Sequence, residues 1–132
     1  MADGLVAADT DVVIDFLRAQ DPGAAAVRAL IRQRRLALTA VTAFELRLGA
    51  DFVHRRDVIE PLLARRTRPL DLRAAVLAGQ VAARLRADGE GIGMADSLQA
   101  GICLRFGLPL LTRNVRHFSR VPDLEVRTPG TD

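Results

Sequence analysis

The fold is decided by one stretch near the N-terminus, Leu5-Val6-Ala7-Ala8-Asp9-Thr10-Asp11. Its four consecutive apolar residues predict a short buried strand, and residues 11–18 then have the spacing of a helix. A strand that is buried on both faces and leads into a helix is typical of a parallel sheet covered by helices. Asp9 would then lie at the carboxyl edge of the sheet, where ligands bind in such folds.

The same order of strand and helix recurs along the rest of the chain. Further strands are predicted at 36–39, 67–70, 109–112 and 124–127, and further helices at 24–34, 42–48, 53–64, 72–88 and 94–106. Asp71 is predicted to cap the longest helix and Gly107 to end the next one. The alternation predicts an α/β fold with a mainly parallel sheet, and the length predicts one domain over residues 1–132.

The composition excludes several kinds of chemistry. All 19 basic side chains are arginine, which excludes the lysine of a Walker A loop, of a protein kinase and of a Schiff-base enzyme. The only cysteine, Cys103, is expected in the core, and it excludes an internal disulfide and multi-cysteine metal sites. Aromatic residues are only 4% of the chain, so contacts with nucleic acid are expected at phosphates rather than by base stacking.

The N-terminus has no basic segment before its apolar run, as a signal peptide would, and no stretch approaches the roughly 18 uninterrupted apolar residues of a membrane span. A cytoplasmic location and no membrane partner are therefore expected.

Polar side chains follow three of the predicted strands. Asp9 and Asp11 follow the first strand, Glu45 comes shortly after the second, and Asn114 follows the strand at 109–112. Carboxylates held within a few ångströms repel one another unless some are protonated or a cation lies among them. Oxygen ligands without a cysteine or a histidine pair select a hard ion. The sequence thus predicts a Mg²⁺ or Mn²⁺ site at which the carboxylates of Asp9, Glu45 and Asp96 face one cavity.

Each acid also has a purely structural interpretation. Asp9 could cap the helix that follows it, and Asp96 would be stabilised by the dipole at a helix start whatever its role. Glu45 fits a capping box, in which it would reach back to the backbone of Thr42. Asp15 is expected to be a solvated or capping acid.

Histidine and arginine side chains supply the remaining candidates. His54 and His117 have no partner at metal-ligand spacing, so neither is expected to be catalytic. Arg113 and Arg116 flank Asn114, where their guanidinium groups could hold an RNA phosphate.

Four short motifs follow one another in order, and they read LVAADTD at 5–11, TAFELRLG at 42–49, IGMADSLQA at 92–100 and LTRNVRHF at 111–118. Together they resemble PIN-domain proteins, specifically the VapC toxins of type II toxin-antitoxin operons. The resemblance implies a three-layer α/β/α sandwich, a Mg²⁺- or Mn²⁺-dependent endoribonuclease, a VapB-like antitoxin as partner, and a homodimer. It also implies that a metal-activated water cleaves RNA to leave 5′-phosphate and 3′-hydroxyl ends.

The resemblance assigns the catalytic and metal-binding acids of the family to Asp9, Glu45 and Asp96. Two positions depart from the family pattern: Asp11 stands where asparagine is common, and Asn114 stands where many members have a fourth acid. As a neutral amide, Asn114 can orient a water or a ligand but cannot offset charge, so the number of metal ions stays open. Thr112 is expected to form a hydrogen bond within the acidic shell.

Two alternatives to a ribonuclease remain at this point. The segment from Asp9 to Ile14 also fits the first motif of haloacid-dehalogenase-like phosphohydrolases, but those enzymes place a lysine against the phosphate and this chain has none. The other alternative is a catalytically weak PIN module that binds RNA or a partner, and Asn114 is the residue that motivates it.

Overall fold

A computed structural model describes residues 4–130. Within that part of the chain, five strands form one sheet in the order β3-β2-β1-β4-β5, and every neighbouring pair is parallel. The strands are β1 (Val6–Ala8), β2 (Leu36–Thr39), β3 (Thr67–Arg68), β4 (Leu110–Leu111) and β5 (Val126–Arg127). The helices are α1 (Thr10–Leu17), α2 (Gly23–Arg32), α3 (Ala40–Leu48), α4 (Phe52–Arg66), α5 (Leu72–Ala87), α6 (Met94–Phe106) and α7 (Val115–Phe118).

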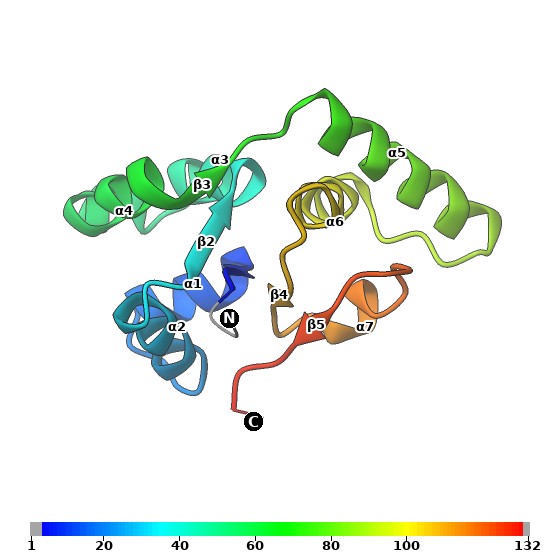
Figure 1. Ribbon diagram of the computed structural model, residues 1–132. Helices are drawn as coiled ribbons and strands as arrows, with labels where there is room; N and C mark the ends of the chain where they lie inside the picture. The colour runs from blue at the N-terminus through cyan, green and yellow to red at the C-terminus, as the bar shows by residue number, and fades with distance from the viewer. Residues whose placement is uncertain (1–3, 131–132) are drawn as a thin grey trace.

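Helices cover both faces of the sheet, as the ribbon shows with α1, α2 and α4 on one side and α5, α6 and α7 on the other (Figure 1). Side chains alternate between the faces along β1, because Val6 and Ala8 pack with the first group of helices and Ala7 packs with the second. All three residues are buried, since a central parallel strand is covered on both faces. The predicted three-layer α/β/α sandwich with a parallel sheet is confirmed.

The helix ends agree with the predicted caps. The side chain of Asp71 accepts a hydrogen bond of 2.8 Å from the backbone N–H of Ala74 at the start of α5. Gly107 ends α6 with a φ of 66°, in the left-handed region that glycine adopts without a steric cost. The strands at β3, β4 and β5 are shorter than predicted, and α7 was not predicted, because four residues are too few to show a helical period.

The buried face of α5 is not the one that its larger apolar residues predict. Leu72 and Val76 are exposed, whereas Ala74 and Ala78 are buried against α6. The reason is the close approach of the two helices at Gly101, where an added Cβ would lie 2.6 Å from the Cβ of Ala78. Small side chains therefore define the contact at Gly101, and Leu72 and Val76 are left at the surface, whereas Val81 and Leu85 further along α5 are buried.

No helix within residues 4–130 is both long enough and apolar enough to cross a membrane.

Candidate functional site

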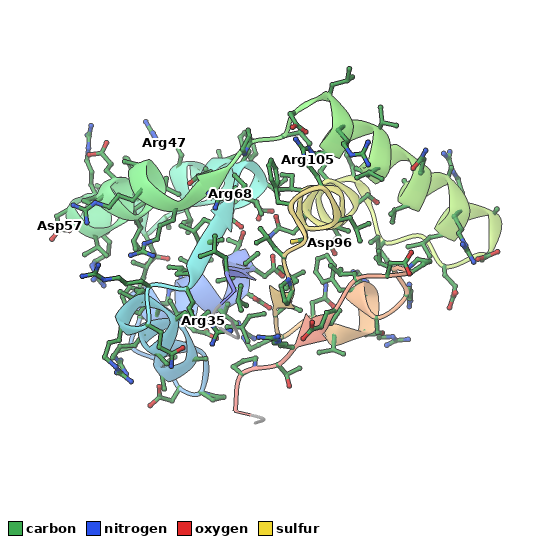
Figure 2. All side chains as sticks on the ribbon, in the orientation of Figure 1. Arg35, Arg47, Asp57, Arg68, Asp96 and Arg105 are labelled. Carbon is green, nitrogen blue, oxygen red and sulfur yellow. The ribbon has the colours of Figure 1, made fainter. Side chains whose placement is uncertain are left out.

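The candidate site lies at the carboxyl edge of the sheet, where β1, β2 and β4 end side by side. Asp9 directly follows β1, Thr39 is the last residue of β2, and Thr112 directly follows β4. The parallel arrangement places these three positions together although they are far apart in the sequence. α3 and α6 then bring Glu45 and Asp96 to the same region, the latter from the first turn of α6 (Figure 2).

Asp9 is the most enclosed acid of the site. Its Oδ1 accepts hydrogen bonds from the backbone N–H of Thr10 at 2.9 Å and from Nε2 of Gln99 at 3.0 Å, and its Oδ2 accepts one from the hydroxyl of Thr112 at 2.7 Å. Burial, and then the neighbouring charge of Asp11, raise the pKa of Asp9 to about 6, against the lowering effect of these bonds. Asp9 also caps α1, so its structural interpretation holds alongside the functional one.

Asp11 lies beside Asp9 and is held by two backbone donors. Its carboxylate accepts from the N–H of Val12 at 2.7 Å and from the N–H of Arg113 at 2.9 Å. Burial nevertheless raises the pKa of Asp11 above its ordinary value. Burial is the main cause of the raised pKa of both carboxyls, and their hydrogen bonds do not fully offset it.

Glu45 points to α1 rather than to its own helix. Its Oε1 accepts a hydrogen bond from the hydroxyl of Thr10. The residue that caps α3 is Thr39, whose hydroxyl accepts from the N–H of Thr42 at 3.1 Å. The capping-box interpretation of Glu45 is therefore wrong, and its carboxylate is available to the site.

Asp96 contacts two residues that follow β4. Its Oδ2 lies 2.8 Å from Nδ1 of His117 and 3.4 Å from Nδ2 of Asn114, and these two nitrogens are 3.1 Å apart. The sequence did not predict a role for His117. The available signal was its spacing, because a residue three positions after Asn114 lies on the same face of a helix.

One hydrogen-bonded network joins the predicted residues. It runs from Glu45 through Thr10, Thr42 and Gln99 to Asp9, and from Asp9 through Thr112 and Asn114 to Asp96. Within residues 4–130, however, no three His, Cys, Asp or Glu side chains are arranged so that they could hold a metal ion. The three acids expected to face one cavity each have partners of their own: Asp9 accepts from Gln99 and Thr112, Glu45 accepts from Thr10, and Asp96 lies against His117.

Arg113 and Asp15 form an ion pair at the border of the site. Nε of Arg113 lies 2.9 Å from Oδ2 of Asp15, and Nη2 lies 3.3 Å from Oδ1. Asp15 is 7% exposed, so the expectation of a solvated acid is wrong, and the reason is its guanidinium partner. Arg113 therefore spends much of its donor capacity on Asp15, whereas Arg116 is exposed.

Cys103 is buried in the core, as expected, and burial raises the pKa of its thiol to about 12. A thiol in this state is not a nucleophile.

The donor set of the site is chemically suited to a hard divalent cation. Asp9, Asp11, Glu45 and Asp96 offer only carboxylate oxygens, the ligands that Mg²⁺ prefers. A bound cation would favour the ionised form of Asp9, whose pKa is raised chiefly by burial and then by the charge of Asp11. Glu45 and Asp96 both belong to the hydrogen-bonded network that contains Asp9.

A parallel α/β sandwich with acids at the carboxyl edge of its sheet defines the class of this protein. The family model of the PIN domain matches residues 6–124, and the chain belongs to the PIN-domain family. This result confirms the resemblance on the four motifs, and it shows that the phosphohydrolase alternative is wrong.

Within the PIN-domain family, the chain is similar to proteins named VapC. The chain is 30% identical over 130 residues to a protein of Shigella flexneri named tRNA(fMet)-specific endonuclease VapC. The matched region covers 88% of this chain and 91% of the relative. It is 31% identical over 124 residues to Ribonuclease VapC19 of Mycobacterium tuberculosis, covering 89% and 94%. The DNA-bound VapBC structure from Salmonella typhimurium has the same fold, with a TM-score of 0.79 and 24% identity over 95% of this chain and 98% of that one.

Proposed function

We propose that this chain is the toxin of a VapBC-type pair, a metal-dependent endoribonuclease that cleaves RNA phosphodiesters. The observation that carries the proposal is the network of acids Asp9, Glu45 and Asp96 at one edge of a PIN-domain sheet. The names of the VapC relatives, an endonuclease and a ribonuclease, support the same reaction. No lysine is required, because the charge of the phosphate is offset by a cation and by arginine.

Asp9, Glu45 and Asp96 would hold the cation, Mg²⁺ or Mn²⁺, and Asp11 adds negative charge beside Asp9. When bound, the cation would lower the pKa of a water molecule and offset charge on the phosphate. Asn114 bonds to Asp96 and would orient this ligand or a water without adding charge.

The remaining residues of the edge bind and orient. Thr112 donates to Asp9 and accepts a hydrogen bond of 2.9 Å from the backbone N–H of Asn114, so it links Asp9 to the residue whose side chain contacts Asp96. Arg116 is exposed beside this edge and would bind a phosphate of the RNA strand. Arg113 contributes less to RNA binding than its position suggests, because Asp15 occupies its guanidinium group.

The proposal is tested by incubating total RNA with the purified protein and Mn²⁺. Cleavage is expected, with 5′-phosphate and 3′-hydroxyl ends, and it should stop with EDTA or in the variants Asp9→Asn and Asp96→Asn. The matched control is Asp57→Asn, because Asp57 lies on the outer side of α4, away from Asp96 (Figure 2). RNA that is bound but not cut would support the catalytically weak module instead. Two observations favour that module: Asn114 stands in place of an acid, and no three acids of residues 4–130 are grouped closely enough to hold a metal ion.

We also propose a VapB-like antitoxin as the partner, together with a homodimer and a cytoplasmic place of action. Apolar side chains at the surface near Glu45 support a protein partner, since Phe44, Leu48 and Val53 are at least two-thirds exposed. Expression with and without the product of the neighbouring gene tests this, and the cleavage sites mapped across cellular RNA should disappear when both are present. Unchanged cleavage with the neighbouring product would contradict the pairing.

A further inference from the structure

Gln99 is a buried polar side chain in the core-facing side of α6. It is 1% exposed, and it lies between the ends of β1 and β2 rather than at the surface. Its Oε1 accepts from the hydroxyl of Thr39, and its Nε2 donates to Asp9 at 3.0 Å and to the hydroxyl of Thr42 at 3.2 Å. Both the oxygen and the NH₂ group of the amide therefore have hydrogen-bond partners, as the burial of an amide requires.

The orientation of this amide is fixed from the β2 side. The hydroxyl of Thr39 accepts the N–H of Thr42, so its single proton is free to be donated to Oε1 of Gln99. The opposite orientation of the amide would place Oε1 against the carboxylate of Asp9. Two oxygens without a proton between them repel each other, so Nε2 faces Asp9.

The same amide reaches Glu45 through two hydroxyls. Thr42 accepts from Gln99, and its hydroxyl lies 3.0 Å from that of Thr10. Thr10 uses its proton toward Glu45, and Thr42 therefore donates to Thr10. All donors in this chain point from Gln99 outward, and they end on the carboxylates of Asp9 and Glu45.

We propose that Gln99 is a positioning residue of the candidate site, which holds Asp9 and, through Thr42 and Thr10, Glu45 in one arrangement for a divalent cation. It does not touch the cation or the RNA. The inference rests on the proposed function, because it treats Asp9 and Glu45 as ligands. A neutral amide suits this task, since it supplies two donors without adding a charge beside the acids.

The first test uses the unaltered protein. Mg²⁺ is titrated into ¹⁵N-labelled chain, and the side-chain NH₂ signals of Gln99 are followed by NMR. These signals should move with the same midpoint as the backbone amide of Thr10, while the side-chain signals of the exposed Gln80 stay in place. Movement of the Thr10 amide without movement of the Gln99 signals would overturn the proposal.

The second test removes the donors but keeps the side-chain length. Gln99→Met should weaken Mn²⁺ binding, measured by calorimetry, by about 10- to 100-fold, the usual effect of losing a residue that orients a metal ligand. Gln80→Met is the matched control and should keep the original Kd. Thr39→Ser should also keep it, because serine retains the hydroxyl that fixes the amide, whereas Thr39→Val should weaken binding.

Thermal unfolding in EDTA shows whether each variant folds. If Gln99→Met does not fold, the NMR titration of the unaltered protein alone tests the role of Gln99. An unchanged Kd in a folded Gln99→Met variant would overturn the role of Gln99 while RNA cleavage by the original chain still supports the proposed function. Absence of both Mn²⁺ binding and cleavage in the original chain would overturn the two proposals together.

Discussion

Nδ1 of His117 lies 2.8 Å from Oδ2 of Asp96, which joins α7 to the first turn of α6 at the edge of the sheet. A neutral imidazole that donates from Nδ1 leaves Nε2 as an acceptor, so His117 can orient Asp96 without a formal charge. Both side chains are only partly exposed, at 39% for His117 and 29% for Asp96. A histidine that fixes one oxygen of a carboxylate in this way determines which oxygen remains for a cation.

Replacing His117 should reduce activity more than stability. His117→Ala is expected to lower Mn²⁺-dependent RNA cleavage by about 10- to 100-fold, because Asp96 loses the donor that orients it. Initial rates on a single RNA substrate measure the effect, and urea unfolding measures the stability.

His54→Ala is the matched control for this change, since His54 is exposed on α4. Faster cleavage by His117→Ala would show the opposite role, with His117 holding Asp96 away from the cation.

Restoring an acid at position 114 should change metal binding. Asn114→Asp would place a carboxylate close to Asp96, where Nδ2 of Asn114 now lies 3.4 Å from Oδ2. Repulsion between the two carboxylates should lower the free energy of unfolding without metal, and a bound cation should reverse the loss. Calorimetry with Mn²⁺ is expected to give tighter binding or a second site. The same stoichiometry and the same Kd as the original chain would contradict this expectation.

The sequence predicts the fold better than it predicts the contacts within the site. The strand at 36–39 and the end of α6 at Gly107 agree with the structure, because an apolar run and a left-handed glycine are local signals. The bond from Thr10 to Glu45 joins residues 35 positions apart. No local pattern reports such a contact, so the capping box was an equally good interpretation of Glu45.

Gln99 shows the same limit more sharply. A glutamine in an apolar helix gives no sign from its spacing that it is buried, and its partners lie directly after β1, in β2 and in α3. Only the parallel order of the strands brings these partners to one point. The exposed Leu72 is the converse case, because the close contact at Gly101 overrides the hydrophobicity of α5.

The raised pKa of Asp9 predicts a pH-dependent stability in the absence of metal. The folded chain holds the Asp9 proton up to about pH 6, whereas the unfolded chain releases it near 3.8, so stability falls as pH rises between these values. Asp9→Asn removes this loss. The free energy of unfolding of the variant, relative to that of the original chain, should therefore rise across that window by up to about 3 kcal/mol. Urea unfolding in EDTA from pH 4 to 7.5 measures the difference, and a difference that does not change with pH would contradict the prediction.

The ion pair of Arg113 with Asp15 should contribute to the stability of the fold. Asp15 is buried and Arg113 is about half exposed, so each single change to alanine is expected to cost about 1–3 kcal/mol, less than for a fully buried pair. In a double-mutant cycle, the double change should cost less than the sum of the two single changes, because the second change removes a side chain whose partner is already lost. Additive single changes would show that the pair contributes nothing beyond packing.

Gly101 should be intolerant of even a methyl group. A Cβ at this position would lie 2.5 Å from the backbone oxygen of Ala74 and 2.6 Å from the Cβ of Ala78, so α5 and α6 would have to separate. Gly101→Ala is expected to destabilise the fold by about 1–3 kcal/mol despite the higher helix propensity of alanine. Gly79→Ala on the exposed side of α5 is the control, because its Cβ would meet no atom within 4 Å and should stabilise slightly. Equal stability of the two variants in urea would show that the helices can move apart without cost.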